Sequence, residues 1–344
     1  MHSMLREILE QPDVVGRLLE SAADSAKQVA LLAKARSVKQ IVLVARGTSD
    51  HAAIYGQYLF QTENRIPAFL ATPSVVTLYD GPVVLPDSLV IGISQSGRAQ
   101  DVMEYMAAAR AGGSPVVAIT NEPNSAFGDL ADVTIGLGAG VEKSVAATKT
   151  YTASLAALAL ISAMLKDTPE ALHALDEAPG LITSAVEASK VLPELALHSA
   201  VQDECFVIGR GLNYSTALET ALKIMETCYI RARAYSSADF LHGPVAAAMT
   251  VPCIVYVPQD RARHAVVEVA MRLFSQGTPL MVVACDTDSL RLGVDSVAIP
   301  YAKSSWLDPL AQIVIGQRLA YHLSVGKGLN PDAPRGLTKV TVTV

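Results

Sequence analysis

Residues 89–97 constrain the fold of this chain more than any other stretch. The apolar run 89–93 (Leu-Val-Ile-Gly-Ile) is typical of a buried parallel strand. It ends in Ser94-Gln95-Ser96-Gly97, and residues 98–110 then carry apolar side chains at helical spacing. Two hydroxyls, the Gln95 amide and the N–H groups of a helix start can bind one anion, and glycine permits the turn. The alternative is an ordinary strand-to-helix turn in which a serine caps the helix.

The succession of strand, small polar turn and helix recurs along the first half of the chain. We expect strands over 41–45, 68–71, 89–93, 115–120 and 133–137, and helices over 3–10, 12–36, 52–60, 98–110 and 150–166. Such alternation predicts a parallel sheet in which ligands lie outside the carboxyl ends of the strands. The turn at 46–50 (Arg-Gly-Thr-Ser-Asp) also follows a strand. We therefore expect it to face the same crevice as the turn at 94–97, which favours ligand binding over capping.

The same pattern begins again after residue 203, which indicates an internal repeat. Residues 206–211 (Phe-Val-Ile-Gly-Arg-Gly) align with 42–47 (Val-Leu-Val-Ala-Arg-Gly), and Gly211 is as far from Gln259 along the chain as Gly47 is from Gln95. We expect strands over 204–209, 253–257 and 280–284, and a helix over 215–231. The second copy has Pro-Gln-Asp-Arg at 258–261, and the carboxylate would repel a phosphate. Only the first copy is therefore expected to bind an anion.

These patterns predict two copies of one α/β module, a phosphate-binding one over 38–166 and a catalytic one over 203–327. N-terminal helices over 1–37, a helical connection over 167–202 with prolines as breaks, and a C-terminal tail over 328–344 complete the expected domain organisation. A length of 344 residues fits about two domains, and the 51% of apolar residues fits buried parallel sheets.

Composition excludes several classes of protein. The net charge of −6 without a basic cluster argues against nucleic acid as a partner. The longest apolar run, 153–165, is too short to span a membrane, and charges near the N-terminus argue against a signal peptide. The four cysteines show no C-x-x-C spacing, and two of them lie in apolar runs typical of buried thiols, so we predict a reducing cytoplasm without disulfides. We expect neither a metal site nor a redox cofactor.

Two stretches of the second copy carry candidate catalytic side chains. Lys223 and Glu226 lie three residues apart, on one face of the expected helix, with apolar neighbours on most sides. A carboxylate in such surroundings suits a general base, whereas the alternative for this pair is a surface ion pair. His242 precedes a Gly-Pro turn that can aim its ring, although a histidine there can also be purely structural.

Several of these motifs together resemble those of a known protein family. The chain resembles the sugar isomerase (SIS) domain family and is similar to the isomerase half of glucosamine-6-phosphate synthase, the glutamine:fructose-6-phosphate amidotransferase. The resemblance covers nearly the whole chain and rests on ordered motifs, namely Gly47-Thr48-Ser49, Ser94-Gln95-Ser96-Gly97, Val145-Ala146-Ala147-Thr148-Lys149, Ala217-Leu218-Glu219, Lys223-Ile224-Met225-Glu226, Leu241-His242-Gly243-Pro244, Pro334-Arg335-Gly336-Leu337 and Lys339-Val340-Thr341-Val342. It implies an α/β fold of two tandem SIS domains, each a parallel-sheet three-layer α/β/α sandwich.

The resemblance also implies a role for each matching residue. The positions that hold the sugar 6-phosphate or the sugar are Gly47, Thr48, Ser49, Ser94, Gln95, Ser96, Val145 and Ala147. Glu226 would move a proton between C1 and C2 of the sugar, supported by Lys223, and His242 would assist ring opening. Lys339 would offer a cation or form a Schiff base, and the Val/Thr alternation at 340–344 indicates a docked strand rather than a disordered tail. Because the His-Gly-Pro loop of this family reaches into a neighbouring subunit's site, a homodimer is implied.

Two departures bear on the substrate. The usual Ser-Gln-Ser-Gly-Glu-Thr of the family is Ser-Gln-Ser-Gly-Arg98-Ala99 here, and a serine of the family stands as Ala147.

The sequence also shows no cysteine before Cys205 and no glutaminase domain. We therefore predict an isomerase or deaminase that converts an amino-sugar phosphate such as glucosamine 6-phosphate to fructose 6-phosphate and ammonia, as stand-alone glucosamine-6-phosphate deaminases do. The alternatives are an aminating synthase half without glutaminase, or a regulator that binds sugar phosphate without turnover.

Overall fold

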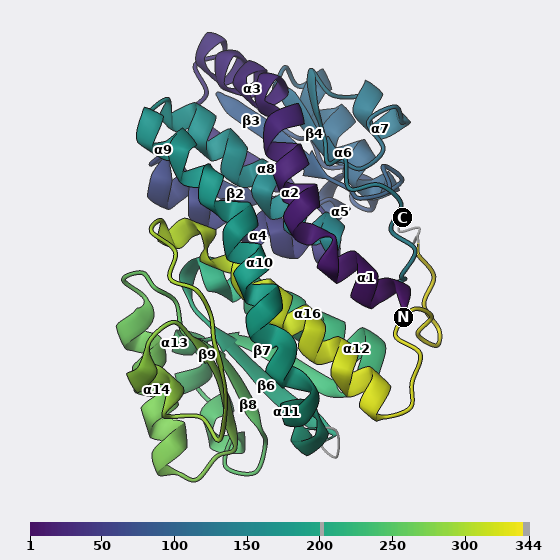
Figure 1. Ribbon diagram of the computed structural model, residues 1–344. Coiled ribbons are helices and arrows are strands. Elements are labelled where there is room, and N and C mark those ends of the chain that lie inside the picture. Colours follow the sequence, from purple (N-terminus) through teal and green to yellow (C-terminus); the bar gives the residue numbers. More distant parts are fainter. Residues whose placement is uncertain (200–202, 340–344) are drawn as a thin grey trace. The chain divides into compact units, whose positions relative to one another are not determined.

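The computed structural model describes residues 1–199 and 203–339, and its chain divides into two compact units. The first-sheet unit comprises Asp13–Glu142, Lys149–Asp176 and, among the described tail residues, Thr338 and Lys339. The second-sheet unit comprises Met1–Pro12, Lys143–Thr148 and Glu177–Leu337. The elements of each unit can be followed in Figure 1.

The first-sheet unit is built on five parallel strands in the order β2-β1-β3-β4-β5. The strands are β1 (Gln40–Val44), β2 (Ala68–Leu70), β3 (Ser88–Ile93), β4 (Val116–Thr120) and β5 (Val133–Gly136). In β1 and β3 nearly every residue is buried on both faces, as the apolar runs predict. Register pairs Val42 with Val90 and Val44 with Gly92, so β1 and β3 end side by side.

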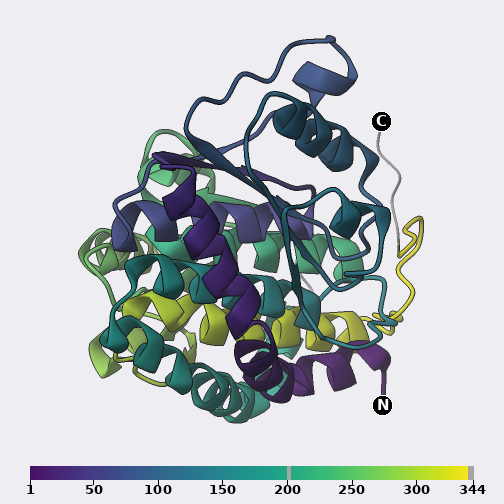
Figure 2. The same ribbon diagram turned by 90° about the horizontal axis from the view of Figure 1, so that it is seen from above.

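Helices cover both faces of this sheet. The helices wholly within the unit are α3 (Ala23–Ala35), α4 (Thr48–Glu63), α5 (Ser74–Thr77), α6 (Gln100–Ala111), α7 (Ala126–Asp129), α8 (Lys149–Lys166) and α9 (Pro169–Ala174), and α2 spans Gln11–Ser21. Val42, Val90 and Met106 belong to a core cluster between the sheet and α6 with α7. Gly56 of α4 faces Leu158 of α8 and Leu43 of β1, which places these helices on the other face. The view turned by 90° shows the strands of this sheet with α6 on one side and α4 on the other (Figure 2).

The second-sheet unit repeats this topology. Its parallel strands follow the order β10-β9-β8-β6-β7, with β6 (Glu204–Gly209), β7 (Arg231–Ser236), β8 (Cys253–Tyr256), β9 (Leu280–Ala284) and β10 (Asp295–Ala298). Its helices are α1 (Ser3–Leu9), α10 (Ala178–Ala188), α11 (Leu192–Ser199), α12 (Tyr214–Cys228), α13 (Ser237–Leu241), α14 (Arg263–Ser275), α15 (Thr287–Leu290) and α16 (Asp308–Gly326). α12 and α16 cross closely, because a Cβ added to Gly316 would lie 2.1 Å from Thr220 Oγ1. The fold prediction of two parallel-sheet α/β repeats is confirmed.

Some local predictions differ from the structure. The helix expected over 215–231 ends at Cys228, because Tyr229 adopts a left-handed conformation with φ 58°, and Arg231 begins β7 instead. β10 was not expected, and the helix expected from 98 begins at Gln100. The predicted strand at 340–344 lies outside the described residues. Among the helices of the described ranges, none combines the length and the apolar character that a membrane span requires.

Candidate functional site

The two polar turns of the first-sheet unit lie at the carboxyl ends of neighbouring strands. Residues 45–47 follow β1 and residues 94–99 follow β3, which pair in parallel. In the strand order 2-1-3-4-5 the chain changes direction across the sheet between β1 and β3. Ligands of doubly wound sheets bind at such a switch point. The structure therefore places Gly47, Thr48, Ser49, Ser94, Gln95 and Ser96 at the edge where a ligand is expected.

The turn after β3 offers polar side chains that the rest of the described chain leaves free. Ser94 is 5% exposed, and its N–H donates to Ile119 O at 3.0 Å. No described residue forms a hydrogen bond with the side chains of Ser94, Gln95 or Ser96. The residue that precedes α6 is Ala99, which makes no side-chain cap. The capping alternative is therefore wrong for the turn at 94–97, and its hydroxyl and amide groups are available to a ligand.

The turn after β1 is tied to the first turn of α6 by an ion pair. Gly47 has φ +56°, and its carbonyl accepts hydrogen bonds from Asp50 N at 2.9 Å and His51 N at 3.2 Å as α4 begins. Arg46 Nε donates to the buried carboxylate of Asp101 at 2.5 Å, and Asp101 lies in the first turn of α6. Burial raises the pKa of Asp50, although His51 and Arg46 oppose the shift. This link was not predicted from the sequence.

The corresponding turn of the second-sheet unit is already occupied by side chains of its own. Gln259 donates from its backbone N to Asp308 Oδ2 at 2.9 Å and from its amide to Asp308 Oδ1 at 2.6 Å. Its amide oxygen accepts a hydrogen bond from Ala302 N at 2.9 Å, and Asp260 accepts one from Ala262 N at 2.7 Å. A carboxyl group of the protein thus lies against the glutamine that aligns with Gln95. That the second copy binds no phosphate stays a prediction.

α12 carries the predicted proton-transfer pair. Lys223 is fully buried, and its Nζ lies 2.6 Å from Glu226 Oε2 and 3.3 Å from Glu219 Oε1. Burial alone would lower the pKa of Lys223, but the two carboxylates together raise it. The side chains of Lys223 and Glu219 are 0% exposed, whereas that of Glu226 is 21% exposed. The surface ion-pair alternative is therefore wrong for Lys223, and Glu226 is the member of the group that solvent can reach.

His242 lies exposed at the end of α13. Its backbone N donates to Asp239 O at 3.1 Å, and no described residue makes a hydrogen bond with its ring. Gly243 follows with φ +148°, and Pro244 comes next. The described residues therefore do not hold the ring in the way that a structural histidine would be held.

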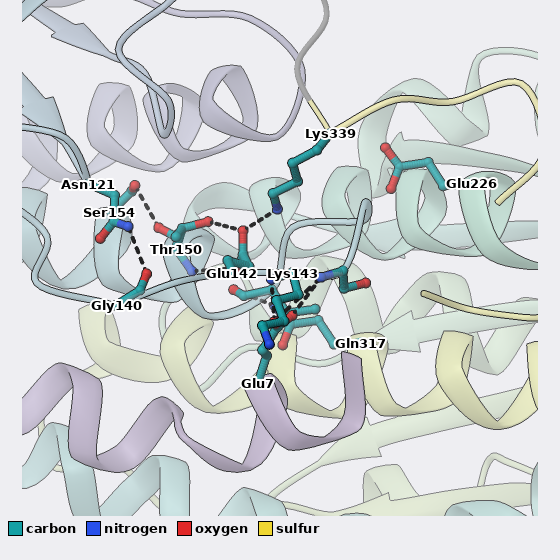
Figure 3. Close-up of polar contacts among 12 residues, drawn as sticks. Glu7, Asn121, Gly140, Glu142, Lys143, Thr150, Ser154, Glu226, Gln317 and Lys339 are labelled. Carbon is teal, nitrogen blue, oxygen red and sulfur yellow. Dashed lines mark hydrogen bonds and ion pairs between the residues drawn. The ribbon is translucent and has the colours of Figure 1, made fainter. Parts of the chain in front are cut away.

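Two more predicted positions, Val145 and Ala147, lie in the 143–148 segment of the second-sheet unit. Val145 N donates to Asp332 O at 3.2 Å. Val145 and Ala147 are both partly exposed. The segment is also held by Glu7, whose carboxylate accepts hydrogen bonds from the backbone N of Lys143 at 2.5 Å and of Ser144 (Figure 3). This anchor on α1 was not predicted.

Lys339 forms an ion pair within the first-sheet unit. Its Nζ lies 2.7 Å from Glu142 Oε2, and Glu142 also accepts hydrogen bonds from the backbone N and Oγ1 of Thr150 (Figure 3). Glu142 was missed by sequence reasoning. The only signal was an acidic residue three positions before Val145 in a segment of small residues, and its partner lies 197 residues further along the chain.

The structure thus gathers the predicted residues into two groups. The first-sheet unit holds Gly47, Thr48, Ser49, Ser94, Gln95, Ser96 and Lys339, and the second-sheet unit holds Val145, Ala147, Lys223, Glu226 and His242. The first group has the donors that an anion requires, and the second has the carboxylate and imidazole that move protons.

Comparisons with known proteins agree with these features. A family model described as SIS domain matches residues 34–164 and 200–299. The glutamine–fructose-6-phosphate aminotransferase (isomerizing) of Pyrococcus horikoshii is 34% identical over 350 residues, which cover 100% of this chain and 58% of that protein. The enzyme of the same name from Aquifex aeolicus is 32% identical with the same coverage. The chain therefore spans less than two thirds of the length of these relatives.

Solved structures share the fold. The C-terminal domain of glucosamine-fructose-6-phosphate aminotransferase from Francisella tularensis has a TM-score of 0.87 and 26% identity, covering 97% of this chain and 98% of that one. A glucosamine-6-phosphate deaminase from Thermotoga maritima has a TM-score of 0.79 at 20% identity, covering 99% of this chain and 100% of that one, and shares the fold. Because the family match extends over both sheets and the sequence likeness over the whole chain, this protein belongs to the SIS domain family, with two SIS modules.

Proposed function

We propose that this protein is a sugar-phosphate isomerase and deaminase that converts an amino-sugar 6-phosphate, such as glucosamine 6-phosphate, to fructose 6-phosphate and ammonia. The first support is the 34% identity along the whole chain with an isomerizing aminotransferase named for fructose 6-phosphate. The family match and the two groups of candidate residues are the further supports. No metal or redox cofactor enters the proposed chemistry.

In this proposal the phosphate binds at the switch point of the first sheet. Ser94, Gln95 and Ser96 offer side chains without a partner in the described chain, and the Gly47 turn lies beside them. A phosphate bound there by several donors would fix the position of the sugar, and fixed position lowers the barrier to proton transfer. Arg98 lies in the same turn and adds a positive charge.

The observation that carries the proposed chemistry is the Glu219–Lys223–Glu226 group of α12. A buried ammonium holds the carboxylate of Glu226 at 2.6 Å while that carboxylate stays partly exposed. A carboxylate fixed in this way is suited to take a proton from one carbon and deliver it to the next. Glu226 would move the proton between C1 and C2, His242 would open the ring, and Lys339 would act on the carbonyl.

The direction of the reaction follows from the chemistry of ammonia. Ammonia in water is mostly protonated at neutral pH, and ammonium cannot add to the carbonyl of a ketose. The reverse step, hydrolysis of an imine with release of ammonia, needs only water. The second candidate is the aminating direction, which the likeness to the aminotransferases favours. Supplying fructose 6-phosphate with ammonium and measuring glucosamine 6-phosphate distinguishes the two directions.

We also propose a homodimer with shared sites. The ring of His242 is exposed and makes no hydrogen bond within the described chain, as expected for a side chain that completes a neighbouring subunit's site. Mixing a Glu226→Gln variant with a His242→Ala variant tests this. Recovered turnover in the mixture is expected, and a mixture as inactive as its components would contradict shared sites.

The central experiment is the Glu226→Gln variant. We expect release of ammonia from glucosamine 6-phosphate to be abolished while binding of fructose 6-phosphate, measured by calorimetry, persists. Undiminished turnover in Glu226→Gln would overturn the proposed chemistry. Binding without turnover in the wild-type protein would favour a regulator that senses sugar phosphate.

A further inference from the structure

Glu142 is a buried carboxylate that shares one oxygen with the ammonium of Lys339. Its Oε2 lies 2.7 Å from Lys339 Nζ and accepts a hydrogen bond from Thr150 Oγ1 at 2.8 Å, while its Oε1 accepts one from Thr150 N at 3.1 Å (Figure 3). The side chain of Glu142 is 0% exposed, whereas that of Lys339 is 26% exposed. A reagent or substrate can therefore reach the amine but not the carboxylate behind it.

The position of Glu142 is fixed by contacts other than Lys339. Thr150 belongs to the first turn of α8, so the carboxylate lies at a helix N-terminus, where the helix dipole favours a negative charge. The segment before Glu142 is held by Asn121, which accepts a hydrogen bond from Ala139 N and donates one to Gly140 O, both at 2.9 Å. These contacts, which do not involve Lys339, hold Glu142 in its position.

A lysine that adds to a carbonyl must first lose a proton, because only the neutral amine is a nucleophile. The proton acceptor must lie within hydrogen-bond reach of the nitrogen. We propose that Glu142 is this acceptor: it holds Lys339 as an ammonium before the sugar arrives and exchanges the proton with it during Schiff-base formation. This inference rests on the proposed function, in which Lys339 meets a ketose carbonyl.

The proton on Nζ passes to Oε2 of Glu142, and the nitrogen lone pair forms a bond to the carbonyl carbon while the π pair moves to the oxygen. A second proton then passes from the positively charged nitrogen to the oxyanion, which gives the carbinolamine. Its hydroxyl takes the first proton back from Glu142 and leaves as water, while the nitrogen lone pair forms the C=N bond of a protonated imine. The two hydrogen bonds from Thr150 favour the ionised carboxylate, so Glu142 returns the proton readily.

The test compares Glu142→Gln with the wild-type protein in two measurements. In the first, acetic anhydride labels amines without sugar, and trypsin cleavage after Arg335 releases a fragment beginning at Gly336 on which the label at Lys339 is read by mass. In the second, fructose 6-phosphate and borohydride trap the Schiff base on the same fragment. Ser154→Ala is the matched control, because Ser154 donates to Thr150 O in the same helix.

Opposite changes in the two measurements are the expected signature. Loss of the carboxylate should raise labelling of Lys339 severalfold, because Nζ is no longer held in its ion pair with Glu142 at 2.7 Å. Trapping of the sugar should fall about tenfold or more, because the proton acceptor and donor is missing. Ser154→Ala should match the wild type in both. If Glu142→Gln fails to fold, Glu142→Asp, whose shorter side chain withdraws the charge from Nζ, should show smaller changes in the same directions.

The remaining outcomes overturn one of the two proposals. Unchanged trapping in Glu142→Gln, with an adduct on the wild type, overturns the role of Glu142 and leaves the proposed function standing. A fall in both measurements means that Lys339 has merely been displaced, which also overturns the proton exchange. Absence of any adduct on the wild type overturns the role of Lys339 in the proposed function, and the labelling result then still tests the ion pair.

Discussion

Lys223 donates to Glu226 from a position without solvent exposure, over a distance of 2.6 Å. Its second partner, Glu219, is equally buried, at 3.3 Å. One ammonium thus lies between two carboxylates of the same helix, at i−4 and i+3. The geometry leaves the outer carboxylate partly exposed and buries the inner one beside the ammonium.

Replacing Lys223 by methionine should destabilise the protein strongly. The substitution keeps the volume but leaves Glu219 buried without its ammonium, and removing one partner of a buried ion pair costs about 3–5 kcal/mol. Urea unfolding monitored by circular dichroism measures the loss. The double variant Lys223→Met/Glu219→Gln should recover part of it, because the remaining buried charge is removed. A single variant as stable as the wild type would show that solvent reaches Glu219.

Ser94 and Ser88 provide a matched pair at the two ends of β3. Ser94→Ala should leave the free energy of unfolding unchanged, because no described residue forms a hydrogen bond with its hydroxyl, but should weaken fructose 6-phosphate binding about tenfold or more. Ser88→Ala should lower the free energy of unfolding and leave fructose 6-phosphate binding unchanged. Its hydroxyl accepts from Gln40 Nε2 at 2.8 Å and donates to Pro86 O at 3.0 Å, and losing these bonds costs about 1 kcal/mol. Calorimetry and urea unfolding give the two readouts, and unweakened binding in Ser94→Ala would contradict a phosphate site at this turn.

The central strands could be predicted from the sequence, and the edge strands of the second sheet could not. β6 and β9 begin and end where the apolar runs predicted, because a strand between two neighbours is buried on both faces. β7 and β10 are the edge strands of their sheet, and β7 alternates arginine with alanine. Such a pattern lacks the apolar run by which the other strands were recognised. The end of α12 could not be predicted either, because no glycine or proline marks it. Tyr229 itself adopts the left-handed conformation that ends the helix.

The polar turns of the site could be predicted because each is contiguous in sequence. The carboxylates that hold the surrounding groups could not, since each meets its partner far along the chain. Asp101 lies 55 residues from Arg46, Asp308 lies 49 from Gln259, and Glu142 lies 197 from Lys339. Nothing local in the sequence marks which of the acidic residues will be buried in this way. Side chains that position others therefore emerge only from the fold.

Asp308 gives the second-sheet unit a pH-dependent stability. Burial raises its pKa to about 7, although the N–H of Gln259 opposes the shift, and nearby Asp260 adds to it. The unfolded chain loses this proton near pH ~3.9, so between pH ~4 and the folded pKa the folded state binds one proton more than the unfolded state, and stability falls as pH rises through this window. Asp308→Asn removes this dependence. Urea unfolding at several pH values should show the wild type losing up to about 1.4 kcal/mol per pH unit relative to the variant, and no further difference above the folded pKa. Any change in stability that the amide of the Asp308→Asn variant itself causes is the same at every pH and so does not alter this slope. If the free energy of unfolding had the same pH dependence in both proteins, Asp308 would be ionised throughout.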